Sequence, residues 1–163
     1  MTGTTFAGMT RRVSLLGCGL LAGTAVTVGF LELALRRLSG LEYVRVRQAE
    51  FTVFTWFIGG VLVPTLIAVA MLAVQERREL PRPALPPAAF ALALLLLALA
   101  VSLAVNGPIN VEQLSWNPQN PPADWARIRD RWQIAHGVRT AAIVLALGCL
   151  TAATADRRRP TVV

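Results

Sequence analysis

The chain has 163 residues, of which 55% are hydrophobic and 15% are charged, and its mean hydropathy is +0.55. This composition argues against an ordinary soluble domain and indicates a membrane protein. The net charge is +7, and all 16 basic residues are arginines. These arginines flank the apolar runs without forming one dense patch. That pattern favours anchoring at lipid headgroups, so the lipid bilayer is an expected partner and nucleic acid is not.

Four apolar runs each approach the roughly 20 residues that a helix needs to cross the hydrocarbon core of a bilayer. The first continues for 17 residues past Cys18, which is too long for a signal peptide, so we interpret it as an uncleaved helix. Little chain remains outside the runs, which predicts a single all-α domain over residues 1–163, a bundle of four antiparallel transmembrane helices. The predicted spans are 13–35, 51–74, 87–105 and 137–155.

Small residues inside the spans are interpreted as packing positions. Gly19 and Gly23 form a GxxxG pair, which is typical of close contact between membrane helices. Cys18 and Cys149 lie in the first and last spans, where either a disulfide or two unbonded side chains at a helix contact is possible.

The connection between the third and fourth spans contains two expected helix ends. Gly107 permits a left-handed turn and Pro108 cannot continue a helix, so the third helix is expected to stop there. Asn120 as N-cap and Pro121 at the first helical position are expected to start the last helix. If that helix runs to Ala155, it is longer than the bilayer and extends beyond it.

The arginines do not decide the orientation by number, because four spans place eight of them on each side of the membrane. The terminal clusters are short and adjacent to spans, which favours both termini, with the proline-rich turn 75–86, on the cytoplasmic side. We therefore expect a multi-pass protein of the cell membrane with both termini in the cytoplasm.

Polar residues of the membrane zone gather at one end of the predicted bundle. The alternating direction of the spans brings together the end of the first, the start of the second, the exit of the third and the start of the fourth. Polar groups at membrane depth are costly, so they form either a functional site or a hydrogen-bonded cap that locks the helix ends. The candidates are Glu32, Asn106, Asn110, Trp125, Trp132, His136 and Arg139.

The stripe before the last apolar run carries the most unusual chemistry. Trp125, Arg129, Trp132, His136 and Arg139 are spaced 4, 3, 4 and 3, so they follow one helix face. His136, the only histidine, has an unperturbed pKa near neutrality and is the candidate general base. Arg139, one turn further, can stabilise an oxyanion. We expect Trp132, His136 and Arg139 to face the bundle interior around a cavity, with Asn110 lining it. One histidine gives neither a bis-histidine haem nor a zinc site, so no metal is expected.

The chain resembles the anthrone-oxygenase-like family of small four-helix membrane proteins in three segments. They are the third-helix exit Pro108-Ile-Asn110, then Asp124-Trp125, and then Trp132-xxx-His136-xx-Arg139 before a final apolar helix. The resemblance implies oxidation of an anthrone to an anthraquinone in aromatic polyketide biosynthesis, with O₂ as co-substrate and without a bound cofactor. It also implies that Asn110, Trp132, His136 and Arg139 serve the reaction, with Asn106 and Trp125 as further positions.

The residues are compatible with that chemistry. An anthrone must lose a proton from its central methylene, and the resulting anion can react with O₂ itself. The chain contains a base, a cation for the oxyanion, amides for carbonyl or phenol groups, and tryptophans for a flat aromatic ring.

A non-catalytic membrane protein that binds a lipid, a quinone or a partner protein explains the bundle and the polar end equally well. In that alternative His136 donates to Glu32 or Asn110 and has no catalytic purpose. The oligomeric state is not indicated.

Overall fold

The structure is a computed structural model that describes residues 2–79 and 85–156. The regular structure of these residues is entirely helical, and the predicted all-α architecture is confirmed. Residues 80–84 of the proline-rich turn and the terminal arginines 157–159 lie outside the described residues. The elements are α1 (Thr2–Leu35), α2 (Gly40–Glu79), α3 (Pro87–Val101), the short π-helix η1 (Ser102–Asn106), α4 (Gly107–Leu114) and α5 (Trp125–Asp156).

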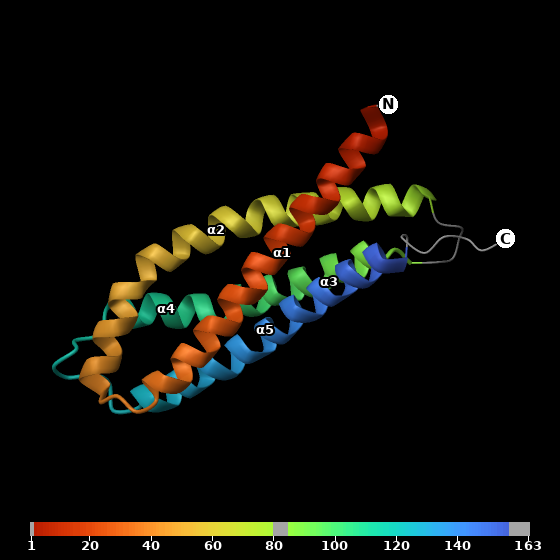
Figure 1. Ribbon diagram of the computed structural model, residues 1–163. Helices are drawn as coiled ribbons and strands as arrows, with labels where there is room; N and C mark the ends of the chain where they lie inside the picture. Colours follow the sequence, from red (N-terminus) through yellow and green to blue (C-terminus); the bar gives the residue numbers. More distant parts are fainter. Residues whose placement is uncertain (1, 80–84, 157–163) are drawn as a thin grey trace.

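The four long helices form an antiparallel bundle (Figure 1). α1 packs against α2 and α5, and α3 packs against the same two helices on the other side. The start of α1 and the end of α5 lie at one end of the bundle (Figure 1). The α1–α2 turn and the α4–α5 loop lie at the opposite end, which we call the loop end.

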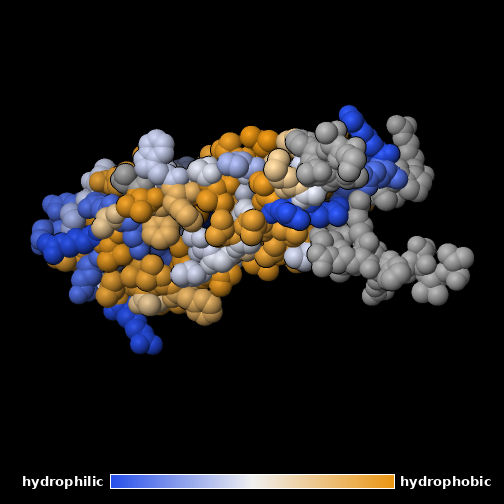
Figure 2. All heavy atoms as spheres, turned by 45° about the horizontal axis from the view of Figure 1, so that its top comes forward, coloured by the Kyte–Doolittle hydropathy of each residue, from blue (hydrophilic) through white to orange (hydrophobic). Residues whose placement is uncertain are grey.

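Four stretches of the described helices are long and apolar enough to cross a membrane, as the composition predicted. Figure 2 shows a broad apolar surface between hydrophilic residues at the loop end and a second hydrophilic group near the other end. α5 has 32 residues and is therefore about 48 Å long, which exceeds the roughly 30 Å of the hydrocarbon core. The stretches are Ala7–Leu35, Val53–Glu79, Pro87–Leu114 and Trp125–Ala152.

The second helix begins eleven residues before the predicted apolar run, at Gly40. A capping box formed by Ser39 and Glu42 explains this early start. The Glu42 carboxylate accepts hydrogen bonds from the backbone N–H of Ser39 (2.9 Å) and from its hydroxyl (2.8 Å). These two bonds, the backbone one foremost, lower the pKa of Glu42. Apolar periodicity alone does not detect this polar first part of α2.

The expected break after the third span is wrong, because the chain stays helical through Gly107 and Pro108. Gly107 has φ −61° and ψ −56°, and its N–H donates to the Ser102 carbonyl five residues earlier. Proline is tolerated in membrane helices where a local π turn satisfies the backbone groups that it leaves free. The wide turn of η1 therefore lets Pro108 occupy the first turn of α4 without ending the helix.

The expected start of the last helix is also wrong: α5 begins at Trp125 instead of following Asn120. The residues before it form turns, in which the Trp125 N–H donates to the Pro122 carbonyl at 3.0 Å. The first carbonyl that accepts a helical bond from four residues ahead is that of Asp124, bonded by the Ile128 N–H at 3.1 Å. Asn120 and Pro121 therefore belong to the loop.

The bundle half away from the loop end holds an apolar core that joins all four long helices. Cys18, Val69, Leu95 and Ala146 are fully buried within it. Cys18 and Cys149 are both free, so no disulfide links the first and last helices. The close contact between α1 and α2 lies at Gly17, where a methyl group would collide with the Thr65 side chain. The expected GxxxG contact is not formed within the chain, because a Cβ on Gly19 or Gly23 meets no atom within 4 Å.

Candidate functional site

Arg47 of α2 is the centre of a polar network at the loop end. Its Nη1 donates to Glu32 Oε1 of α1 at 3.0 Å and to Glu50 Oε2 at 3.3 Å. Its Nη2 donates to Asn110 Oδ1 at 2.8 Å, and its Nε donates to Gln113 Oε1 at 3.1 Å. One guanidinium thus joins α1, α2 and α4 and forms ion pairs with two carboxylates.

Trp132 connects this network to α5. Its Nε1 donates to Asn110 Oδ1 at 2.7 Å, and the guanidinium carbon of Arg47 lies 4.3 Å from the centre of its ring. Its other neighbour is His136, whose ring is stacked at 4.9 Å with an interplanar angle of 7°. Asn106 of η1 donates to the Trp132 backbone carbonyl at 3.0 Å. The indole is therefore fixed by its hydrogen bond to Asn110 and by its ring contacts with Arg47 and His136. The bond from Asn106 fixes the helix backbone at the same residue.

His136 and Arg139 form a hydrogen-bonded pair in which the donor and acceptor atoms can be assigned. His136 Nε2 lies 2.9 Å from the Ala25 carbonyl of α1, which can only accept, so Nε2 carries the proton. Nδ1 then accepts from Arg139 Nε at 3.1 Å and Nη2 at 2.8 Å. Arg139 Nη1 also donates to the Ser102 hydroxyl at 3.3 Å. Both nitrogens of the neutral imidazole are thus occupied, and the ring holds the guanidinium in place.

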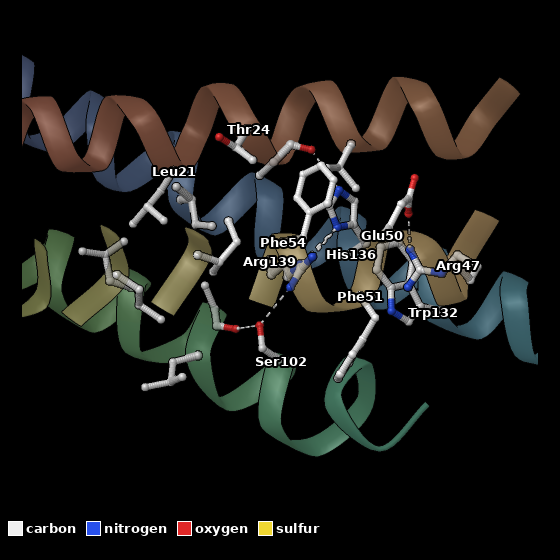
Figure 3. Close-up of a pocket in the computed structure, with 18 residues that line it drawn as sticks. Leu21, Thr24, Arg47, Glu50, Phe51, Phe54, Ser102, Trp132, His136 and Arg139 are labelled. Carbon is white, nitrogen blue, oxygen red and sulfur yellow. Dashed lines mark hydrogen bonds and ion pairs between the residues drawn. The ribbon is translucent and has the colours of Figure 1, made fainter. Parts of the chain in front are cut away.

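These side chains border a cavity between α1, α2, α3 and α5 (Figure 3). In the close-up, Arg139 lies between His136 and Ser102, Phe54 lies beside it, and Phe51 lies further away, on the side of Trp132. The cavity has a volume of about 110 Å³, and about 820 Å³ of space lies among the lining atoms when the open mouth is included. Most of the wall is apolar, and its polar side chains are Thr24, Arg47, Glu50, Ser102, Trp132, His136 and Arg139.

Arg139 is a cation that forms no ion pair with a carboxylate of the described residues. Its polar partners among the described residues are the neutral His136 ring and the Ser102 hydroxyl. Arg47, by contrast, forms ion pairs with both Glu32 and Glu50. A charge at membrane depth is costly unless it is paired or faces a polar cavity. The cavity therefore offers a ligand that carries a negative charge a guanidinium that no carboxylate contacts directly.

The comparison with protein-family models now adds to this geometry. A model described as anthrone oxygenase matches residues 51–149, which is more than half of the chain. The chain belongs to the anthrone oxygenase family. A comparison with curated proteins and a comparison with solved structures each gave no match. The matched region contains Asn106, Asn110, Trp125, Trp132, His136 and Arg139.

The cavity of this anthrone oxygenase family member also depends on the part of the chain that precedes the match. α1 supplies one wall with Leu21, Thr24, Ala25 and Val28. Arg47 and Glu50 lie on α2 before the matched residues begin. Side chains of α1 and of the start of α2, which precede the matched region, are therefore part of the site.

The structure brings most of the sequence-predicted site residues together. Trp132, His136 and Arg139 line the cavity, as their spacing predicted. The expectation that Asn110 lines the cavity is wrong, because it lies behind the wall, where it accepts from Trp132 and Arg47. Asn106 is buried and bonds the α5 backbone. The expected alternative in which His136 donates to Glu32 or Asn110 is wrong, because Nε2 is directed at a backbone carbonyl.

Two predicted residues lie away from the cavity wall. Trp125 packs at the loop end, with its ring 5.5 Å from that of Tyr43 and 5.0 Å from the Arg129 guanidinium. Glu32 pairs with Arg47 and lines a separate groove between α1 and α5. The structure therefore gives Trp125 a packing contact, and it makes Glu32 a partner of the network that supports Trp132.

Side chains of α2 also line the cavity, whereas the sequence predicted only that Gln48 and Glu50 at the start of this helix lie at the same end of the bundle. Arg47, Glu50, Phe51, Phe54 and Ile58 all line the cavity. Their spacing of 3, 1, 3 and 4 places them on one helix face, a signal that was available in the sequence. Burial is the main cause that raises the pKa of Glu50. The nearby Glu32 carboxylate also raises it, and Arg47 opposes the shift.

The described residues include no group of three or more His, Cys, Asp or Glu side chains arranged to hold a metal ion.

Proposed function

We propose that this protein is a membrane-bound oxygenase that converts an anthrone-like phenolic polycycle into the corresponding quinone. The observation that carries the proposal is Arg139, a cation that forms no ion pair with a carboxylate of the described residues, at the wall of an apolar cavity. The reaction creates a matching negative charge, because loss of the methylene proton converts the substrate into a phenolate-like anion. A preorganised cation at the position of that oxygen favours the anion.

The overall reaction balances with O₂ as the only oxidant. The methylene C–H bond breaks, and the electron pair spreads over the rings onto the carbonyl oxygen. The carbanion carbon then bonds to O₂, which is reduced to a peroxide and takes up a proton. Loss of water from this peroxide breaks the O–O bond and the second C–H bond, and it leaves the second carbonyl. One substrate and one O₂ give one quinone and one water.

The cavity fits the reacting part of such a substrate. Because the cavity has an open mouth, the reacting ring would lie inside and the outer rings would lie in the mouth. Phe51, Phe54 and Trp132 offer aromatic faces along this path. The guanidinium of Arg139 and the hydroxyl of Ser102 would meet the carbonyl oxygen at the inner end.

Oxygen uptake by the purified protein tests this function directly. With an anthrone in lipid nanodiscs, and with a metal chelator and no added flavin, we expect O₂ consumption and quinone formation in a ratio of one to one. Because anthrones oxidise slowly without a catalyst, the control contains the same lipid and the same protein after unfolding. Tight binding of the anthrone without O₂ consumption above this control would contradict the oxygenase and favour a binding protein for quinones or lipids.

A further inference from the structure

Only two side chains in the described lining of the cavity can accept a proton near neutral pH. They are His136 from α5 and Glu50 from α2. A base must have a lone pair directed at the substrate, so the hydrogen bonds of each candidate decide which one can act.

His136 has no such lone pair in this arrangement. Nε2 donates to Ala25, and Nδ1 already accepts two hydrogen bonds from Arg139. A proton placed on Nδ1 would break both bonds and would put two cations about 3 Å apart in an apolar environment. The geometry instead makes His136 a positioning residue that orients the Arg139 guanidinium.

The two neighbouring carboxylates, Glu50 and Glu32, differ in their hydrogen bonds and in their access to the cavity. Both oxygens of Glu32 are engaged, Oε1 by Arg47 and Oε2 by Gln133 at 3.0 Å, and its side chain does not line this cavity. Glu50 lines the cavity, and only its Oε2 accepts a hydrogen bond from the described residues. Its side chain is 19% exposed, compared with 3% for that of Glu32.

We propose that Glu50 is the catalytic base that removes the methylene proton of the substrate, a role that rests on the proposed oxygenase function. The C–H bond breaks, the proton forms an O–H bond with the Glu50 carboxylate, and the electron pair moves to the carbonyl oxygen beside Arg139. Arg47 and Arg139 balance Glu32 and Glu50 before this step. Afterwards they balance Glu32 and the substrate anion. The proton transfer therefore leaves the net charge of the group at zero, which avoids the cost of a new uncompensated charge in a low dielectric.

The pH dependence of the proton transfer follows from the surroundings of Glu50. Burial and Glu32 raise its pKa, Arg47 on the same helix lowers it, and His136 and Arg139 face the same cavity from α5. Only the ionised carboxylate can accept a proton. The rate should therefore be low in acid and rise to a plateau as the pH passes through a pKa above the ordinary value of 4.5 for glutamate.

Anaerobic hydrogen–deuterium exchange at the anthrone methylene isolates this step from the reaction with O₂. In D₂O, wild-type protein should catalyse loss of the methylene proton signal by NMR, and Glu50→Gln should slow it by about 10² to 10⁴-fold. Glu42→Gln is the matched control, because it removes an exposed carboxylate on the same helix. It should exchange like wild type. Glu50→Asp, which keeps a carboxylate, should retain part of the rate and the acid limb of the pH profile.

The possible results separate this proposal from the one on which it rests. If wild type consumes O₂ with the anthrone but Glu50→Gln exchanges at the wild-type rate, Glu50 is not the base. If wild type neither consumes O₂ nor promotes exchange, the oxygenase proposal itself fails. In strong alkali the free substrate ionises unaided, so Glu50→Gln should approach wild-type O₂ uptake there. A deficit that stays equal at all pH values, or that parallels a loss of folded protein in the melting curve, would overturn the role of Glu50.

Discussion

Two arginines at similar positions in the bundle illustrate how neighbours decide the role of a residue. Arg47 contacts two carboxylates and two amides, so its charge is compensated and its geometry is fixed. Arg139 contacts a neutral ring and a hydroxyl, so its charge remains available to a ligand. We infer that Arg47 holds the helices together and that Arg139 meets the substrate.

Replacement of Arg139 by lysine should impair the enzyme while preserving its charge. The planar guanidinium uses Nε and Nη2 on His136 and Nη1 on Ser102, and an ammonium group cannot reproduce this fork. Because a hydrogen bond to a charged group contributes about 1.5 to 3 kcal/mol, we expect kcat/KM for the anthrone to fall about 10- to 100-fold. The control Arg36→Lys alters an exposed ion pair with Asp130 and should keep its activity. Unchanged kcat/KM in Arg139→Lys would exclude the fork as the oxyanion contact.

At the residue scale, the sequence predicted the α5 side of the site and missed the α2 side. Trp132, His136 and Arg139 stand out because polar and aromatic groups interrupt the entry to an apolar helix. Arg47 does not stand out, because arginines at the ends of membrane spans are usually headgroup anchors. Its role depends on Glu32, fifteen residues earlier, and on Asn110, sixty-three residues later, which only the folded bundle brings together.

At the element scale, the spans were predictable and several of their ends were not. Span length follows from hydrophobicity, which the sequence displays directly. The expected break at Gly107-Pro108 followed a local rule, yet the bond from Gly107 N–H to Ser102 and the bond from Asn106 to α5 stabilise a continuous helix. Proline rules describe the α-helix, and a π turn lies outside them.

The packing of α1 against α2 gives a paired test at this scale. Gly17→Ala should destabilise the protein by about 1 to 3 kcal/mol, because the new methyl group collides with the Thr65 side chain. Gly19→Ala has open space and should be neutral, or more stable by up to about 1 kcal/mol, since alanine favours helix. Reversible unfolding of both variants in detergent micelles measures the difference. Equal stability of the two would show that α1 does not meet α2 at Gly17.

At the scale of the whole molecule, the bundle has two chemically different ends. The loop end contains the polar network and the cavity wall of Arg139, whereas the other half is an apolar core around Cys18 and Leu95. We propose that both termini are cytoplasmic, which places the loop end near the outer face of the membrane.

Cysteine labelling of intact cells tests this orientation. In a Cys18→Ala, Cys149→Ala background, Gln119→Cys in the exposed α4–α5 loop should react with a membrane-impermeant maleimide added outside. Arg78→Cys, exposed near the opposite end, should react only after the membrane is permeabilised. The reverse pattern would place the loop end in the cytoplasm.

The π turn at Ser102–Asn106 also sets the angular position of everything that follows it. A helical residue turns the chain by about 100°, so winding these same residues as a regular α-helix would swing the start of α4 through a comparable angle. Asn110 would then leave Arg47 and Trp132, and the cavity would lose the support behind its wall. One surplus residue in the helix acts as a phase adjustment, so a side-chain change that drives this turn into a regular α-helix should disturb the site more than deletion of the surplus residue.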